Sequence, residues 1–167
     1  MANFEQALKK TLEREGGYVN DPDDHGGETY KGIARRFHPD WIGWAYVDNR
    51  DFKNPNLDKL VSDFYYIRFW EPLNIDGLIN QEIATSIFDF AVNAGVKTSA
   101  ILAQKAADVE ADGEIGVNSI NAINSMDAEL FLSNFALAKI VRYVAICKKN
   151  PKNKKYFFGW VCRTLNQ

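Results

Sequence analysis

Helical spacing of apolar residues is the feature that most limits what this chain can fold into. Apolar side chains recur every three to four residues in one segment after another, from residue 4 to residue 165. This period matches one face of an α-helix, whereas a half-buried β-strand needs a period of two. The sequence therefore predicts an all-α protein of about seven to eight helices, with at most one small β-hairpin near residues 18–33.

The ends of the expected helices are marked by polar caps, glycines and prolines. Asn3 is expected to cap the first helix, which runs to Glu15. Further helices are expected at residues 33–37, 56–69, 80–94, 99–109, 118–124, 127–149 and 156–165. The helix at 80–94 is expected to lie buried at the centre of the protein, and residues 40–54 are aromatic and irregular.

Length and composition predict one compact domain. The chain has 167 residues, of which 46% are hydrophobic, so residues 1–167 suffice for one well-buried core. Cys147 and Cys162 fit neither a disulfide framework nor a zinc site. No basic and apolar leader precedes the first helix, and no uninterrupted apolar run reaches about 18 residues. We expect synthesis in the cytoplasm without a signal peptide, and no integral membrane segment.

Glu15 is the most informative single residue. At about 100° per residue it falls within the apolar stripe that Phe4, Leu8 and Leu12 form on the first helix. It also occupies the last helical turn, where the macrodipole is negative and two glycines follow. We expect both the apolar surroundings and the dipole to favour the protonated carboxyl and to raise its pKa. The alternative is a helix end that frays into water. A carboxyl group that keeps its proton near neutral pH is suited to general acid catalysis.

An acidic turn follows Glu15 closely along the chain. Residues 20–27 read Asn-Asp-Pro-Asp-Asp-His-Gly-Gly, and residues 28–33 are expected to form a short hairpin arm. We expect Gly26, Gly27 and Gly32 to supply the backbone angles or the close approach that such turns need. Hydrolysis of a glycosidic bond usually requires one protonated and one ionised carboxyl group. A helix end followed by an acidic turn could place one on each side of a cleft.

The run from Glu15 to Ile33 resembles the signature of glycoside hydrolase family 108. Members of this family are lysozyme-like N-acetylmuramidases, found among phage-type lysins and bacterial secretion-activator proteins. Residues 88–95 and 112–116 resemble later landmarks of the family, so the similarity covers nearly all of the chain. The resemblance implies a lysozyme-like fold with a catalytic lobe at 1–75 and a helical, predicted peptidoglycan-binding lobe at 76–167.

The resemblance also implies the site residues. It makes Glu15 the catalytic acid of an N-acetylmuramidase that cleaves the glycan strand of bacterial peptidoglycan. In the wider phage-lysozyme group an Asp nine residues later and a Thr shortly after it complete the active site, which corresponds to Asp24 and Thr29. The spacing from Asp24 to Thr29 is one residue shorter than in that group, and Asp21 is the alternative second carboxylate.

Other residues are candidates for substrate contact. Sugar rings have apolar faces that stack on aromatic side chains, so we expect Tyr18, Trp41 or Trp44 to line a sugar subsite. Packing in the core is the alternative for each tryptophan. Asn93, near the end of the helix at 80–94, is a candidate to hydrogen-bond substrate or to cap that helix.

No metal or cofactor is expected. Residues 21–26 and 108–113 both resemble the opening of an EF-hand loop, but the twelfth position of each loop holds Gly32 or Ser119 where a bidentate Glu is required. His25 and His38 are too few and too scattered for a catalytic zinc centre.

Charge is distributed unevenly along the chain. Residues 130–167 hold eight basic and no acidic side chains, whereas residues 1–129 hold all 22 acidic ones. This cationic segment could face anionic wall polymer, lipid headgroups or nucleic acid, or could be a soluble surface that complements the acidic part. No recognised nucleic-acid-binding module surrounds it, so no nucleic acid partner is expected.

A peptidoglycan substrate lies outside the inner membrane, and the sequence shows no export signal. By the resemblance, relatives are encoded with a holin-type hole-former or act with secretion machinery, so we expect action in the periplasm or cell wall after such export. Both phage lysis and a secretion role stay open. The alternative function is a non-catalytic peptidoglycan-binding or secretion-accessory protein. The intact Glu15 and acidic turn argue for the enzyme, because a pure binder needs neither.

Overall fold

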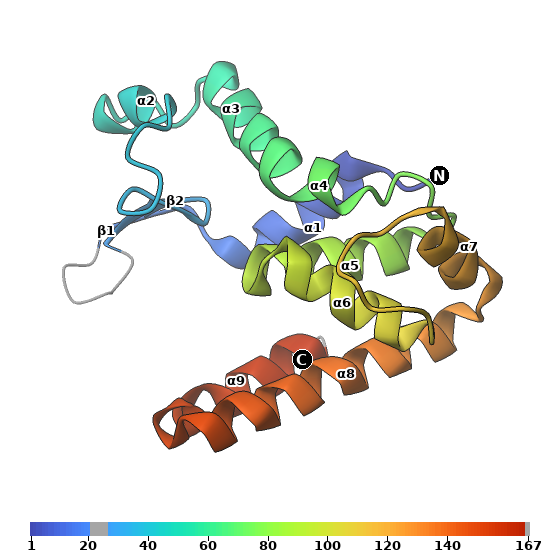
Figure 1. Ribbon diagram of the computed structural model, residues 1–167. Coiled ribbons are helices and arrows are strands. Elements are labelled where there is room, and N and C mark those ends of the chain that lie inside the picture. The colour runs from blue at the N-terminus through green and yellow to red at the C-terminus, as the bar shows by residue number, and fades with distance from the viewer. Residues whose placement is uncertain (21–26, 166–167) are drawn as a thin grey trace. The chain divides into compact units, whose positions relative to one another are not determined.

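The computed structural model describes residues 1–20 and 27–165 and confirms the predicted all-α, lysozyme-like class with its small β element (Figure 1). The elements in chain order are α1 (Phe4–Glu15), β1 (Tyr18–Asn20), β2 (Glu28–Tyr30), β3 (Ile33–Ala34), α2 (Trp44–Asp48), α3 (Pro55–Tyr65), the π-helical turn η1 (Tyr66–Trp70), α4 (Glu71–Leu73), α5 (Gln81–Ala94), α6 (Val96–Ala106), α7 (Val117–Ser125), α8 (Ala128–Lys149), the 3₁₀ turn η2 (Pro151–Asn153) and α9 (Lys154–Thr164).

The chain divides into two compact units. The N-terminal unit comprises Asn3–Pro72, and the C-terminal unit comprises Leu73–Gln167 together with Met1–Ala2. The N-terminal unit holds the sheet and helices α1 to α3, and the C-terminal unit holds helices α5 to α9. The expected lobes at 1–75 and 76–167 stay a prediction as functional divisions.

The N-terminal unit is built around α1. Asn3 caps this helix as expected, because its Oδ1 accepts a hydrogen bond from the Gln6 amide at 3.0 Å. Phe4 then meets the rings of Tyr66 and Trp70, with centroids 5.1 and 5.5 Å away. The buried apolar residues of this unit come from α1, β2, β3, α2, α3 and η1, namely Ala7, Leu8, Tyr30, Ile33, Trp44, Val47, Leu57, Val61, Tyr65 and Trp70.

The C-terminal unit is a helical bundle with α5 at its centre. Ile87 and Phe88 of α5 are fully buried, and the Ser99 hydroxyl of α6 donates to the Ile87 carbonyl at 2.7 Å. Gly95 alone separates α5 from α6, and its φ of 91° is one that side chains rarely adopt. From α8, Phe135 packs edge-on against Phe90 at 5.7 Å. The expected buried helix at 80–94 corresponds to α5.

Helix α8 is the longest element of the C-terminal unit, and α9 runs back alongside it (Figure 1). In the described part of the chain, α8 is the one helix long and apolar enough to cross a membrane by length and composition. Its most apolar 18-residue window has a mean hydropathy of 1.6, although only 28% of that window is buried. Lys139 and Arg142 interrupt its apolar sequence, which is why no uninterrupted apolar run was found there.

The short helix expected at 33–37 does not form. Ile33 and Ala34 form strand β3 instead, paired with Tyr30 and Thr29 of β2, and residues 35–37 are turns. The turn at Lys31 and Gly32 sends the chain back antiparallel to β2, so ladder hydrogen bonds replace helical ones. In the irregular region 40–54 the structure adds a short helix, α2.

Gly43 precedes α2 and lies directly under the ring of Trp41. A methyl group at this position would overlap that ring, although the Gly43 backbone is ordinary helical, with φ −58° and ψ −21°. We expect Gly43→Ala to destabilise the protein by about 1–3 kcal/mol through overpacking. Thermal unfolding followed by circular dichroism measures this effect.

Gly159→Ala is the matched control. Gly159 lies inside α9, and an added Cβ would meet nothing within 4 Å. Alanine is the better helix former, so this variant should melt at or above the wild-type temperature. If Gly43→Ala melts as high as Gly159→Ala, the Trp41 ring does not confine Gly43.

Candidate active site

The backbone of α1 ends at Glu15, as the sequence predicts. Gly16 follows with φ 69° and ψ −175°, which stops the helical hydrogen bonding, and β1 begins at Tyr18. Ala7 and Thr11, the latter one turn before Glu15, are at most 1% exposed, so α1 is held firmly within its unit. The Glu15 side chain lies outside the described part of the structure, as do all atoms of Asp21, Asp24 and Gly26.

A three-stranded antiparallel sheet follows this helix end in the order β1-β2-β3. Thr29 is the middle residue of β2 and pairs with Val19 on one side and Ala34 on the other. Its hydroxyl donates to the Gly27 carbonyl at 3.4 Å. Thr29 is therefore fixed by two neighbouring strands, and its catalytic role stays a prediction.

The turn between β2 and β3 has left-handed backbone angles at both of its central residues. Lys31 has φ 44° and Gly32 has φ 81°, the signs that a type I′ hairpin turn requires. Lys31 is held there from α3, because the buried Tyr65 hydroxyl donates to its carbonyl at 2.7 Å and Asp58 pairs with its ammonium at 2.7 Å. Gly32 thus has the turn role that the sequence predicts.

Gly27, just before β2, also has a left-handed backbone, with φ 62°. A Cβ added there would meet nothing within 4 Å. The left-handed backbone angle is one of the two reasons that the sequence offered for a glycine here.

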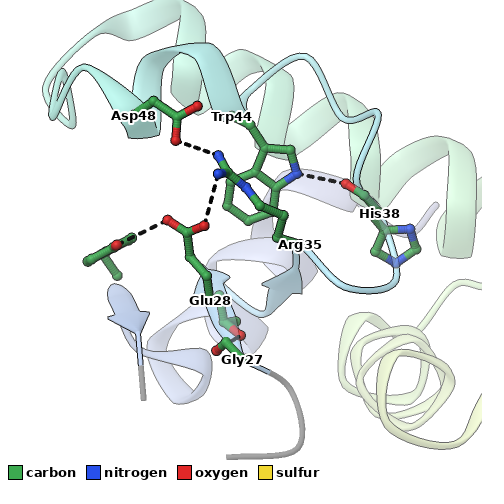
Figure 2. A network of polar contacts seen from close by, with 8 residues as sticks. Gly27, Glu28, Arg35, His38, Trp44 and Asp48 are labelled. Carbon is green, nitrogen blue, oxygen red and sulfur yellow. Dashed lines mark hydrogen bonds and ion pairs between the residues drawn. The ribbon is translucent and has the colours of Figure 1, made fainter. Parts of the chain in front are cut away.

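Arg35 is the centre of a polar network that joins the sheet to α2 (Figure 2). Its Nη1 contacts Glu28 of β2 at 3.0 Å, and its Nη2 contacts Asp48 of α2 at 2.6 Å. The guanidinium also lies over the Trp44 ring, 4.4 Å from the centroid. Glu28 additionally accepts a hydrogen bond from the Tyr18 hydroxyl at 3.0 Å, which connects β1 to the same network.

Sequence reasoning did not find this network. Glu28 lies inside the family-like run, but a carboxylate in a short strand is not distinctive. Arg35 and Asp48 are separated by 13 residues, and no local pattern signals that they meet. Tyr18 and Trp44 are the members that the sequence did single out, both for a different role.

Aromatic rings cluster beside the sheet. Phe52 contacts Tyr18 and Tyr30, with centroids 5.5 and 5.7 Å away, and Trp41 stacks near Tyr30 at 6.4 Å. Trp44 is 5% exposed and donates from its indole nitrogen to the His38 carbonyl at 2.7 Å. Tyr18 and Trp41 remain half-buried and keep part of their surface accessible.

His38 lies at the edge of this cluster. Its ring packs edge-on against Phe64 at 4.8 Å. Burial, and then the nearby charge of Arg68, lower the pKa of His38, which favours the neutral imidazole. His38 is accordingly not suited to hold a proton for general acid catalysis at neutral pH.

The C-terminal unit holds a second polar site, at the run 112–116 that the sequence marked as a landmark. The side chain of Gln104, 1% exposed, donates to Asp112 Oδ1 at 2.7 Å and to Ser119 Oγ at 3.1 Å, and accepts from the Gly113 amide at 2.8 Å. The Glu114 amide and then Gln104 hold the pKa of Asp112 below its usual value. A hollow of about 450 Å³ lies beside this loop.

Asn93 belongs to the C-terminal unit and is exposed at the penultimate position of α5. It therefore belongs to a different compact unit from Tyr18, Trp41 and Trp44. The substrate-binding roles of all four residues stay predictions.

Comparison with known proteins identifies the family. A model of the family described as Glycosyl hydrolase 108 matches residues 8–95, more than half of the chain. The chain belongs to this family. Residues 93–165 match a second model, described as Predicted Peptidoglycan domain. Together the two matches support a glycosidase that acts on peptidoglycan, and they confirm the resemblance seen in residues 15–33.

A solved structure supports the fold. The structure of Brucella abortus SagA superimposes with a TM-score of 0.71 at 24% sequence identity, covering 98% of this chain and 90% of that one. At this identity the likeness establishes the fold alone. A search of curated proteins finds no match.

The Arg35 network generates a prediction about the stability of the N-terminal unit. Arg35→Met removes the guanidinium and leaves Glu28 and Asp48 without their shared cation, so we expect a loss of about 1–2 kcal/mol in unfolding free energy. Arg35→Lys should restore only part of it, because an ammonium cannot reproduce the planar contacts to two carboxylates. Urea unfolding of both variants measures the change in the free energy of unfolding.

Lys53→Met is the control, since Lys53 is an exposed cation of the same unit. If Arg35→Met unfolds at the same urea concentration as this control, the network does not stabilise the sheet. An Arg35→Lys variant indistinguishable from wild type would show that charge alone suffices.

Proposed function

We propose that the protein is an N-acetylmuramidase that cleaves the peptidoglycan glycan strand between N-acetylmuramic acid and N-acetylglucosamine. The observation that carries this proposal is the match of residues 8–95 to the glycosyl hydrolase 108 family, which includes the run from Glu15 to Ile33. The match of residues 93–165 to a peptidoglycan domain supports the choice of polymer.

In this proposal Glu15 is the general acid. Its position as the last residue of α1 places its backbone at the negative end of the helix macrodipole. That field opposes ionisation of a carboxyl group, so the acid keeps its proton until it passes it to the leaving glycosidic oxygen. Arrival of the proton lets the bond break without release of a free alkoxide.

Asp24 is proposed as the ionised partner, and Thr29 as a hydroxyl beside it. An ionised carboxylate either activates a water molecule or stabilises the positive charge that develops on the sugar ring. A threonine hydroxyl both donates and accepts hydrogen bonds, so it could orient that water. The rigid position of Thr29 between β1 and β3 is consistent with such a role.

Substrate contacts are proposed at Tyr18 and Trp41, whose rings keep accessible surface. Trp44 packs edge-on against Trp41, with ring centroids 5.2 Å apart, and is proposed to hold that ring in place. Asn93 is proposed as a hydrogen-bonding contact from α5. We further propose that the enzyme acts in the periplasm or cell wall, reached through a holin-type pore or secretion machinery.

The decisive experiment is hydrolysis of purified cell wall, followed by turbidity. Released fragments are reduced with borohydride and analysed by mass spectrometry, which identifies the sugar at the new reducing end. Reduced N-acetylmuramic acid is the expected product, and reduced N-acetylglucosamine would contradict muramidase specificity. A wall that binds the protein but is never cleaved would favour the alternative, a non-catalytic binding or secretion-accessory protein.

We expect Glu15→Gln to remove nearly all hydrolysis while the protein still folds. Glutamine has the same shape but no acidic proton, and general acid catalysis is typically worth about 10² to 10⁴ in rate. Glu13→Gln is the matched control, because Glu13 is exposed on the same helix. If Glu15→Gln melts like wild type and keeps more than about a tenth of the rate, Glu15 is not the acid.

We expect Asp24→Asn to lose far more activity than Asp23→Asn. Both variants remove one negative charge from the same turn, so a difference between them reports position and not net charge. The rates are measured in the same turbidity assay, beside Asp21→Asn. Equal losses at the three positions, or the largest loss at Asp21, would assign the second carboxylate elsewhere.

A further inference from the structure

Helix α8 has an apolar outer face that no described residue of its own unit covers. Leu137 and Val141 are each 61% exposed, Leu130 is 52% exposed and Val144 is 37% exposed. Their spacings of seven, four and three residues place them on one side of the helix. A helix that is apolar all round is normally buried on all sides, so an exposed apolar stripe of this length points to a binding surface.

The opposite face of α8 is part of the core. Phe131 and Phe135 are fully buried, and the Tyr143 ring packs at a tilt against Trp160 of α9, with centroids 5.1 Å apart. Lys139 is 7% exposed, with its ammonium 4.2 Å from the centre of the Phe135 ring and 3.2 Å from Ser86 Oγ of α5. Removing α8 from these contacts to cross a membrane would expose the core, so the helix is suited to lie on a surface and not to span one.

Cations surround the exposed stripe. Lys105 of α6 and Arg142 of α8 line a hollow of about 540 Å³ together with Leu137, Val141 and Ala145. Lys148 and Lys149 close the C-terminal end of the helix. No acidic residue occurs in residues 130–167, and the acidic residues of this helix, Asp127 at the N-cap and Glu129 in the first turn, lie at the other end of the stripe. From Leu137 to Lys149 the charged side chains of α8 are therefore all positive.

The combination of exposed aliphatic side chains and nearby cations favours one kind of binding partner for this face over the others. A second copy docking through the same face would bring two cationic patches together, which is electrostatically unfavourable. A glycan has hydroxyl groups and no long aliphatic segment to match leucine and valine side chains. An anionic lipid surface offers both negative headgroups and acyl chains, and an apolar helix face flanked by Lys and Arg is the typical interfacial arrangement.

We propose that the outer face of α8, consisting of Leu130, Leu137, Val141 and Val144 with Lys105, Arg142, Lys148 and Lys149 around it, docks the protein on anionic lipid bilayers. The aliphatic side chains enter the headgroup boundary, and the cations contact the headgroups. This surface goes beyond the proposed hydrolysis, because it lies in the C-terminal unit and involves none of the proposed catalytic residues.

The test is sedimentation of the full chain with lipid vesicles over a sodium chloride series. Vesicles of mixed phosphatidylglycerol and phosphatidylcholine should bind the protein, whereas pure phosphatidylcholine vesicles should bind it weakly. The double variant Leu137→Gln/Val141→Gln should lower the partition coefficient about tenfold, because both side chains lose their apolar transfer into the lipid boundary. Added salt should weaken binding of the wild type.

Ile79→Gln/Val117→Gln is the matched control. These two aliphatic residues are 72% and 75% exposed in the same unit but lie off α8, so the control should bind like wild type. Glu15→Gln should also bind like wild type, which separates a failure of this proposal from a failure of the proposed hydrolase activity. Circular dichroism confirms that every variant is folded.

Four outcomes would overturn the proposal. The first is that anionic vesicles fail to sediment the folded wild type, and the second is that Leu137→Gln/Val141→Gln binds no worse than the control. The third is that the wild type binds insoluble peptidoglycan but not vesicles, and the double variant loses the peptidoglycan binding. The partner of this face is then wall polymer. The fourth is that the wild type forms a dimer in sedimentation velocity without binding vesicles, and the double variant is a monomer. The partner of this face is then a second copy of the chain.

Discussion

The ion pairs of Arg35 connect the sheet of the N-terminal unit to helix α2. One guanidinium contacts Glu28 on β2 and Asp48 on α2, and it covers the Trp44 ring. Glu28 and Asp48 are 20 residues apart in the sequence, and their carboxylates would repel each other without this shared cation. At the other end of β2, the Tyr65 hydroxyl holds the Lys31 carbonyl in a left-handed turn. The short strand that carries Thr29 is thus fastened at both ends by contacts from outside the sheet.

Such fastening matters because the sheet is too small to be stable by itself. Its three strands have three, three and two residues, and isolated hairpins are marginal in water. Tyr30 and Ile33 bury their side chains in the core of the unit, which supplies the apolar contacts that the ladder lacks. Precise placement of any group on β2 therefore depends on α2 and α3 as much as on the strand pairing.

Sequence similarity and packing assign helix α5 to different parts of the chain. The glycosyl hydrolase 108 match extends to residue 95 and so includes α5, but the helix packs with α6 and α8 in the C-terminal unit. Sequence similarity therefore places α5 with the hydrolase, whereas packing places it with the peptidoglycan-domain match that begins at residue 93. The reason is the packing of α5, whose buried residues include Ile83, Ile87 and Ala91 and whose neighbours in this unit are α6 and α8.

Local chemistry determined much of this protein in advance. Apolar spacing indicated most of the helices, Asn3 marked the start of α1, Gly16 and Gly17 marked its end at Glu15, and the run to Ile33 indicated the family. Features that depend on which surfaces meet were left to the tertiary structure. Residues 33–37 form strand and turn because Ile33 pairs with Tyr30 across a two-residue hairpin turn. Arg35 forms its ion pairs with carboxylates on two other elements, β2 and α2. The apolar outer face of α8 is the same kind of case, because a period of 3.6 shows that a helix has an apolar side but not whether a neighbour covers it.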